Sequence, residues 1–313
     1  MRWTQQETVR HHLDRVSLAS ALSVSQYEGE ATKSSIQKGT SQMIKLILTD
    51  MDGTFLNSSG DFNRTFFQEI QTLLKQHDIQ FAPVSGKQCE RIEELFLEDA
   101  DGMWILGDSA TRIKRAGTYV YESLLPNKIG RQIIRQLEKL ELGHTIIACT
   151  RAAAVVSETI SDEEWAIVRG SYRQVERVAD LTAIEDDFVK ITIHDPKLRC
   201  FETVKSLEPF RDSTYFVASE AAWIDIANHG VHKGTTVEQL QRILQVRPDE
   251  TMAFGDGYND LELFERADFS YAVSNAVPEL KARAHAVIGS NDADSVLQTI
   301  QRTIEEQAEI KIT

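Results

Sequence analysis

The sequence predicts an α/β protein in which a parallel sheet is interrupted by an inserted α+β domain. From Met43 onward, short apolar runs alternate with stretches of helical period, which is the βαβ rhythm of a parallel sheet with right-handed crossovers. Near residue 124 this rhythm gives way to clustered strands and helices, and it resumes after residue 228. We therefore expect a discontinuous core domain at 43–123 and 229–313, and an inserted domain at 124–228.

The first half of the core begins with "MIKLILTD", residues 43–50, an apolar run that is typical of a buried strand. Further elements are expected in this order: a helix at 63–77, a strand at 79–84, a helix at 88–97, a strand at 103–108 and a hairpin at 111–122. The hairpin is expected to turn at Ala116-Gly117, since glycine suits a tight turn.

The inserted domain and the second half of the core are expected to follow without internal repeats. In the inserted domain we expect helices at 127–141, 161–168 and 198–208, and strands at 144–149, 152–157, 188–193, 213–218 and 221–227. After it we expect helices at 234–245, 259–266 and 278–284, and strands at 251–256 and 269–273. Residues 1–42 are polar and rich in Ser, Gln and Thr, so we expect a poorly ordered extension there.

Composition excludes several classes of partner. The chain of 313 residues is 42% hydrophobic and 26% charged, as in soluble globular proteins, and its formal net charge is −14. That charge argues against a nucleic-acid partner, which requires a basic face. No apolar run approaches a membrane span, so no membrane partner is expected. The three scattered cysteines lack metal-binding spacing and indicate reduced thiols in a cytoplasmic protein. The oligomeric state is not predicted.

Four short polar clusters fall at or near the carboxyl ends of predicted strands. They are Asp50 with Asp52, Ser85-Gly86-Lys87, the loop carrying Lys233, and Asp256 with Asn259 and Asp260. In open parallel sheets, ligands bind beyond these strand ends. We therefore expect the four clusters to converge along one edge of the sheet.

The first cluster, "DMDGTF", allows several interpretations by itself. Asp50 precedes a tight turn formed by Gly53 and Thr54, and it could act as a nucleophile or a metal ligand. A calcium loop is the nearest alternative, but its glycine belongs at the sixth position and here stands at the fourth, and position twelve is Asp61 instead of Glu. A site for a metal–nucleotide complex and a pair of helix-capping aspartates are two further possibilities.

The other three clusters are also ambiguous when each is taken alone. Ser85 and Gly86 could bind a phosphoryl oxygen at a helix start or could form an ordinary turn. Lys233 could be a solvated lysine, and the histidines beside it are expected to be loop residues. Asp256 and Asp260 are hard oxygen ligands of the kind Mg²⁺ prefers. A dinucleotide-binding fingerprint does not fit there, because Asp260 stands where its third glycine belongs.

Together the four clusters resemble the haloacid dehalogenase superfamily of phosphohydrolases, over Met43 to about residue 305. "DMDGTF" is similar to its first motif, Ser85 to its second, Lys233 to its third and "GDGYND" to its fourth. "LGDSATRI", "VHKGTTVEQL" and "SYAVSNAVPELKARAHAV" are similar to stretches of the Cof-type branch. The resemblance implies a Rossmann-like parallel-sheet core with an inserted α+β cap. Departures are Lys87, where arginine is usual, and Gly107-Asp108-Ser109 in place of Asn-Gly.

The resemblance also implies roles for these residues. Asp50 would attack phosphorus and become an aspartyl-phosphate, and Asp52 would protonate the leaving oxygen and then activate water. Mg²⁺ would be held by Asp50, the carbonyl oxygen of Asp52, and Asp256. Lys233, Ser85 and Gly86 would bind the phosphoryl oxygens. Asn259 and Asp260 would position Lys233 or complete the outer coordination of the metal, with Gly53 and Thr54 supporting the turn.

The implied function is a Mg²⁺-dependent phosphatase that acts on a small phosphorylated metabolite, such as a sugar phosphate or a phosphorylated cofactor. A phosphotransferase or mutase using the same intermediate is an alternative, and so is a non-catalytic ligand-binding regulator on the same fold. The cap would close over the site and select the leaving group. Its candidate contacts with substrate are Arg151, Lys190 and Trp223.

Overall fold

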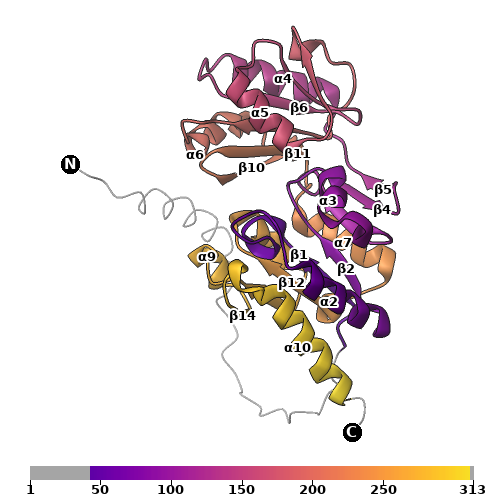
Figure 1. Cartoon of the computed structure of the whole chain (residues 1–313). Coiled ribbons are helices and arrows are strands. Elements are labelled where there is room, and N and C mark those ends of the chain that lie inside the picture. The colour runs from indigo at the N-terminus through magenta and orange to yellow at the C-terminus, as the bar shows by residue number, and fades with distance from the viewer. Residues whose placement is uncertain (1–42, 311–313) are drawn as a thin grey trace, which may run out of the picture. The chain divides into compact units, whose positions relative to one another are not determined.

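The computed structural model describes residues 43–310, so the expected extension at 1–42 lies outside the described residues. Its central feature is a five-stranded parallel sheet in the order β14-β13-β12-β1-β2 (Figure 1). The strands are β1 (Leu46–Thr49), β2 (Gln80–Pro83), β12 (Thr251–Gly255), β13 (Phe269–Ala272) and β14 (Ala286–Val287). The predicted α/β class with an inserted α+β unit is confirmed. No helix in the described part of the chain is both long and apolar enough to cross a membrane.

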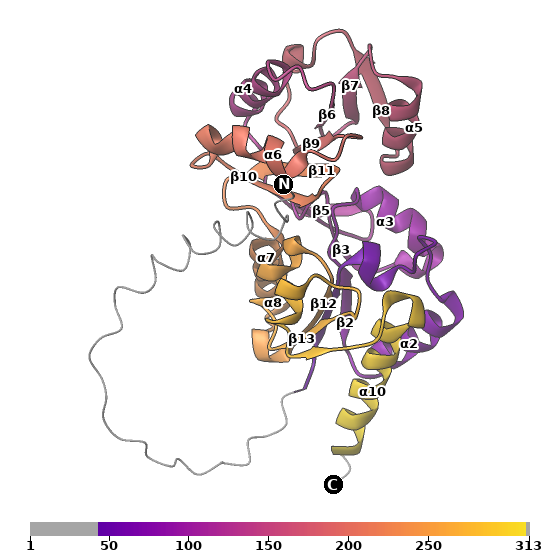
Figure 2. The same ribbon diagram turned by 90° about the vertical axis from the view of Figure 1, so that its left-hand side faces the viewer.

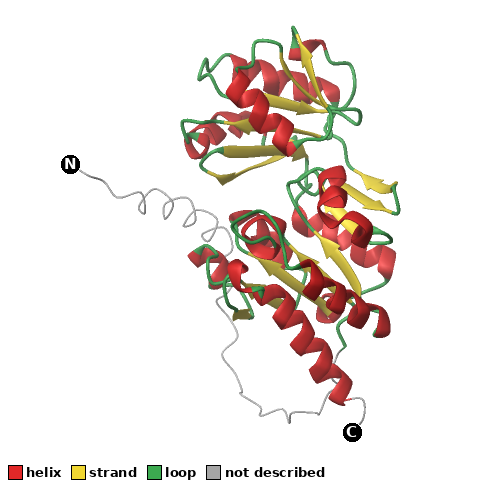
Figure 3. Cartoon of the chain, in the orientation of Figure 1, coloured by secondary structure: helices red, strands yellow, loops and turns green. Residues whose placement is uncertain are grey.

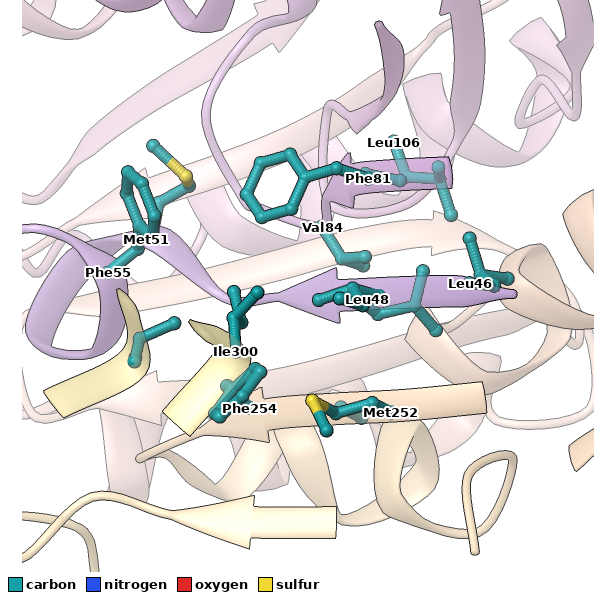
Figure 4. Packing of buried hydrophobic residues seen from close by; sticks show 14 of the residues in the cluster. Leu46, Leu48, Met51, Phe55, Phe81, Val84, Leu106, Met252, Phe254 and Ile300 are labelled. Carbon is teal, nitrogen blue, oxygen red and sulfur yellow. The ribbon is translucent and has the colours of Figure 1, made fainter. Parts of the chain in front are cut away.

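Helices cover both faces of this sheet. Figure 2 shows α7 (Lys233–Leu244) and α8 (Leu261–Phe264) on one side of the strands, and α2 (Arg64–Gln76) and α10 (Ser295–Ile310) on the other. All four residues of β1 are buried, as a strand between two neighbours and two helical layers requires. In the close view, Leu46 and Leu48 pack between side chains of the neighbouring strands β2 and β12 (Figure 4).

Local sequence explains how α2 forms and packs. The side-chain oxygen of Asn63 accepts a hydrogen bond from the Phe66 N–H at 3.2 Å, which caps the first turn. Phe67, Ile70 and Leu74 are the buried residues of the helix, and their spacing places them on one face. The same apolar face therefore fixes the segment that follows the first motif against the sheet.

The third predicted strand forms where it is expected but pairs mainly outside the five-stranded sheet. β3 (Trp104–Gly107) pairs with β4 (Arg112–Arg115) and β5 (Thr118–Glu122) in a separate three-stranded antiparallel sheet. It lies against β2 through a parallel bridge between Val84 and Leu106, and the Trp104 indole N–H donates a hydrogen bond to Oε1 of Gln80 at 3.3 Å. The hairpin turn has φ of 47° at Ala116 and 74° at Gly117, so both central residues are left-handed, as two-residue hairpins prefer. The hairpin prediction is confirmed.

The inserted region contains a six-stranded, mainly antiparallel sheet in the order β10-β11-β9-β6-β7-β8 (Figure 3). Its strands are β6 (Thr145–Cys149), β7 (Ala154–Ser157), β8 (Val175–Val178), β9 (Lys190–His194), β10 (Thr214–Glu220) and β11 (Trp223–Asn228). Its helices are α4 (Asn127–Glu138), α5 (Asp162–Ser171) and α6 (Cys200–Thr203). The predictions did not include β8, in which Glu176 and Arg177 are exposed.

The hydrophobic clusters of the described residues follow the predicted domains. The largest takes its buried members from 44–113 and 237–304, and the two smaller ones take theirs from 125–226. At the crossing between the two regions, the Asn228 amide donates a hydrogen bond to the Ser123 hydroxyl at 3.1 Å. The boundaries at 124 and 228 stay a prediction, and we call residues 124–228 the cap from here on.

Two helices in the second half of the core are shorter than the sequence predicts. The helix expected at 259–266 is a short turn followed by α8, and the one expected at 278–284 is α9 (Pro278–Lys281). The remaining core helix, α3 (Cys89–Phe96), agrees with the expectation to within a residue at each end. The predictions omitted β14 and the long α10, which packs beside α2 in both ribbon views.

Candidate active site

Two neighbouring strands deliver the principal carboxylates. β1 and β12 are parallel, with Thr49 opposite Phe254, so Asp50 and Asp256 follow adjacent strand ends. The Asp50 N–H donates to the Phe254 carbonyl oxygen at 3.0 Å, which extends the ladder to Asp50 itself. The rigid centre of the sheet thus places two acidic side chains side by side.

The chain turns sharply after Asp50, and Gly53 permits the turn. Gly53 has φ of 75°, which favours glycine, and a Cβ there would lie 2.6 Å from Oδ2 of Asp256. The Thr54 hydroxyl donates to Oδ1 of the same carboxylate at 2.7 Å. The turn is anchored by Phe55, whose ring centroid lies 5.5 Å from that of Phe67. Backbone and side chain of the turn therefore pack directly against Asp256.

Lys233 joins the site from the first position of α7. Its Nζ lies 2.5 Å from Oδ1 of Asp50 and 2.6 Å from Oδ1 of Asp260, and its side chain is only 4% exposed. Burial opposes its charge, but the Asp260 and Asp50 carboxylates outweigh that effect and raise the pKa of Lys233. A buried ammonium group therefore touches the proposed nucleophile.

Asp260 organises the loop after β12. Its Oδ2 accepts the backbone N–H groups of Asp256 and Gly257, each at 3.0 Å, while its Oδ1 accepts from Lys233. A Cβ on Gly257 would come within 2.8 Å of the amide oxygen of Asn259. Because both oxygens of Asp260 already accept hydrogen bonds from the protein, this residue fixes Lys233 and the loop in place.

The carboxylates form a cluster that could hold a metal ion. One oxygen each from Asp50, Asp256 and Asp260 lie within 4.8 Å of one another. Burial raises the pKa of Asp50 well above its ordinary value, with Lys233 opposing the shift and the two other carboxylates adding to it. Burial and Asp260 also raise the pKa of Asp256 to about 6. A divalent cation would relieve this repulsion, and the donors are the hard oxygens that suit Mg²⁺.

Asp52 lies outside this cluster of described residues. Its carboxylate is 62% exposed, and Oδ1 lies 2.9 Å from Nζ of Lys87. The departure from the usual arginine at position 87 thus retains a cation next to Asp52. The predicted acid–base group is on the solvent side of the turn and is paired with the loop that follows β2.

The Ser85-Gly86 loop follows β2 beside the site. Ser85 is buried, its N–H donates to the Leu106 carbonyl oxygen at 2.9 Å, and its hydroxyl accepts from the Lys87 N–H at 3.1 Å. The Gly86 carbonyl oxygen accepts from Nζ of Lys190 at 3.0 Å. The second motif is therefore held by one internal hydrogen bond and by hydrogen bonds to β3 and to Lys190 of the cap.

Comparison with known proteins identifies the family. A model of haloacid dehalogenase-like hydrolases matches residues 47–300. The chain belongs to the haloacid dehalogenase-like hydrolases. It is 29% identical over 267 residues to the 5-amino-6-(5-phospho-D-ribitylamino)uracil phosphatase of Escherichia coli, a match that covers 85% of this chain and 98% of the relative.

Solved structures agree with this assignment. The protein SMU.1108c from Streptococcus mutans matches with a TM-score of 0.80 and 28% identity, over 84% of this chain and 99% of that one. The sugar phosphatase BT4131 of subclass IIB has a TM-score of 0.71 at 18% identity, over 82% of this chain and 98% of that one, which shows a common fold. The predicted resemblance, its Cof-type branch and the prediction of a phosphatase enzyme are confirmed at the level of the family.

Two asparagines that support the site of this haloacid dehalogenase-like hydrolase were not predicted from the sequence motifs. The Asn275 amide donates to the Gly53 carbonyl oxygen at 2.7 Å, and the Asn291 amide donates to the Leu56 carbonyl oxygen at 2.9 Å. Both side chains hold the turn after Asp50 from the far end of the chain. Asn275 lies within "SYAVSNAVPEL", the stretch that already resembles the family, so a signal for it was present.

The three candidate cap contacts have different surroundings. Arg151 is 63% exposed and pairs with Glu122 at 3.0 Å. The Trp223 ring packs on His194 with a centroid distance of 4.5 Å. Only Lys190 reaches the described loops of the active site.

Proposed function

We propose that this hydrolase is a Mg²⁺-dependent phosphatase that cleaves small phosphorylated metabolites through an aspartyl-phosphate on Asp50. The observation that carries the proposal is the buried Asp50 carboxylate at the end of β1, in contact with Lys233 and close to oxygens of Asp256 and Asp260. A carboxylate so placed can attack phosphorus in line.

In the first step, an oxygen of Asp50 bonds to phosphorus while the bond from phosphorus to the ester oxygen breaks. The electron pair stays on the leaving oxygen, and Asp52 supplies the proton. In the second step, Asp52 takes a proton from water, the water oxygen bonds to phosphorus, and Asp50 is released with inorganic phosphate. The exposure of the Asp52 carboxyl supports this role, because an exposed group is accessible to a leaving oxygen and to water.

We propose that Asp50, Asp256 and the carbonyl oxygen of Asp52 hold the metal. Asp260 is assigned a positioning role instead, since its oxygens are taken by Lys233 and two backbone N–H groups. Bound Mg²⁺ supplies positive charge that offsets the repulsion between a carboxylate and a phosphate dianion.

Lys233, the Ser85 hydroxyl and the backbone N–H of Gly86 are proposed to bind the phosphoryl oxygens. Such donors are effective when they are fixed before the charge develops, because no reorganisation is then needed. The burial of Lys233 and Ser85 supports this assignment.

The substrate class is proposed from the same chemistry. As its name states, the Escherichia coli relative is a phosphatase for 5-amino-6-(5-phospho-D-ribitylamino)uracil. At 29% identity this supports a sugar-phosphate or phosphorylated-cofactor substrate for the present chain, with the cap selecting the leaving group.

The test is turnover of p-nitrophenyl phosphate with and without Mg²⁺, followed by a panel of phosphorylated metabolites. Asp50→Asn should reduce turnover to background, and acid quenching should trap labelled phosphate on the wild type only. Asp61→Asn is the matched control, since Asp61 is an exposed loop residue paired with Arg64. Wild-type turnover in pure, folded Asp50→Asn protein would refute the assignment.

A further inference from the structure

A second buried lysine lies outside the residues with assigned roles. Lys190, on β9 of the cap, has a side chain that is only 3% exposed. Its Nζ donates to Oδ1 of Asp225 at 3.0 Å, to the Ser109 hydroxyl at 2.9 Å and to the Gly86 carbonyl oxygen at 3.0 Å. An ammonium group has three N–H bonds, so these partners satisfy it completely. We call these four residues the lysine bridge.

The lysine bridge connects the cap to the core. Asp225 lies on β11, the neighbour of β9, and its Oδ1 also accepts from the Thr192 hydroxyl at 2.9 Å. Gly86 and Ser109 lie in core loops that follow β2 and β3. The charge pair therefore belongs to the cap sheet, whereas the two remaining partners belong to the core, one of them in the proposed phosphate-binding loop.

The core side of the bridge is strained. Asp108, Ser109 and Ala110 have φ of 57°, 57° and 64°, three consecutive left-handed residues without a glycine. Such backbone is unfavourable for residues with a Cβ and persists only where surroundings impose it. Here the Asp108 N–H donates to the Lys87 carbonyl oxygen at 2.7 Å, and the Ser109 N–H donates to the Ser85 carbonyl oxygen at 3.2 Å. The strained turn is thus tied to the phosphate-binding loop and presents a hydroxyl to Lys190.

We infer that Lys190 is a positioning residue, which orders the Ser85–Lys87 loop for phosphate when the cap is closed. This inference rests on the proposed function of that loop. When the cap opens, the Lys190–Asp225 pair becomes hydrated, and closure removes that water in exchange for hydrogen bonds to Gly86 and Ser109. The cost of removing water from the charged pair offsets much of the free energy that these hydrogen bonds contribute, so the bridge forms reversibly. A cap that must open to admit substrate requires such reversibility.

The first test removes the bridge without leaving an unpaired charge. In Lys190→Met combined with Asp225→Asn, inorganic phosphate should bind about 10- to 100-fold more weakly in the presence of Mg²⁺, since hydrogen bonds from a charged group are lost. Titration calorimetry measures this without turnover. Hydrogen exchange of the Gly86 and Lys87 amides should become faster. Unchanged phosphate affinity and unchanged exchange would overturn the inference, whatever happens to thermal stability.

A second variant acts from the other side of the bridge. Ser109→Gly removes the hydroxyl, so kcat/KM should fall. The thermal midpoint should not rise, because relief of the left-handed strain is opposed by the loss of a hydrogen bond from the buried Lys190 ammonium. Ala116→Gly is the matched control, because Ala116 is also left-handed but lies in an exposed hairpin turn. It should raise the midpoint and leave kcat/KM unchanged. Equal kcat/KM in wild type and Ser109→Gly would count against the bridge.

Failure of the bridge can be distinguished from failure of the proposed function. If Asp50→Asn abolishes turnover but the bridge variants bind phosphate normally, only the lysine bridge is refuted. If Asp50→Asn remains active, the proposed mechanism is refuted, while phosphate binding and amide exchange still decide the role of Lys190.

Discussion

Replacing Asp256 by asparagine should stabilise the metal-free protein, because this carboxylate lies against other carboxylates. Burial and Asp260 raise its pKa from an ordinary 3.8 to about 6. Each pKa unit corresponds to about 1.4 kcal/mol, so ionising Asp256 in the folded state costs at most about 3 kcal/mol. Residual solvent access to the partly exposed carboxylate reduces the expected gain to about 1–2 kcal/mol.

The sign of the pH dependence follows from the raised pKa. Above about pH 6, Asp256 is ionised in both folded and unfolded chains, and the folded state carries the full penalty. As pH falls from 6 toward 3.8, the folded state takes up a proton before the unfolded state does, and the penalty disappears. The advantage of Asp256→Asn should therefore be greatest above pH 6 and vanish near pH 4.

The assay is urea unfolding of wild type and Asp256→Asn between pH 4 and 8 in the presence of a chelator. Addition of Mg²⁺ at pH 7.5 should then stabilise the wild type and have little effect on the variant, which reverses their order. A variant that is less stable than wild type at pH 7.5 without metal would refute the reasoning. So would an advantage that does not change with pH.

Three further predictions concern neighbouring residues. Asp52→Asn should slow phosphoryl transfer from a sugar phosphate by about 10²–10⁴-fold and transfer from p-nitrophenyl phosphate much less, because nitrophenolate leaves without a proton. Equal losses of rate on the two substrates in single-turnover kinetics would contradict the role of Asp52 as an acid. Gly53→Ala should lower unfolding free energy by about 1–2 kcal/mol and weaken Mg²⁺ binding in calorimetry, since its Cβ would displace Asp256. Lys233→Met should lower unfolding free energy by about 3–5 kcal/mol by leaving buried carboxylates unpaired, whereas Lys205→Met, at an exposed pair, should change it by less than about 1 kcal/mol.

Sequence patterns predicted those parts of the fold in which local composition decides the structure. The apolar run of β1 and the turn at Ala116-Gly117 are examples, because burial on both faces and left-handed φ each demand particular residues. The omitted α10 could also have been predicted, since its buried residues have helical spacing: Val296, Leu297, Ile300 and Ile304. The antiparallel pairing of β3 was not predicted, because it depends on the hairpin that follows β3 and not on its own four residues.

The candidate site likewise has features that could be predicted from the sequence and features that could not. Parallel strand ends bring Asp50 and Asp256 together, and this could be predicted from the order of elements alone. The pairing of Asp52 with Lys87 could not, because it depends on how two loops turn in space. Nor does any local pattern indicate that Ser109 adopts a left-handed backbone, which the hydrogen bonds of a distant loop impose.

The chain passes between the core and the cap at Ser123 and Asn228, two residues that a hydrogen bond joins. Their side chains lie 3.1 Å apart, so a turn of about four residues could close the gap left by residues 124–227. No buried member of the described core cluster comes from that span, and Asp50, Asp256 and Lys233 all lie outside it. We therefore expect that a different cap could be joined to the core at these two positions without rebuilding the sheet that holds Asp50, provided that it replaces the contacts of Lys190 with Gly86 and Ser109.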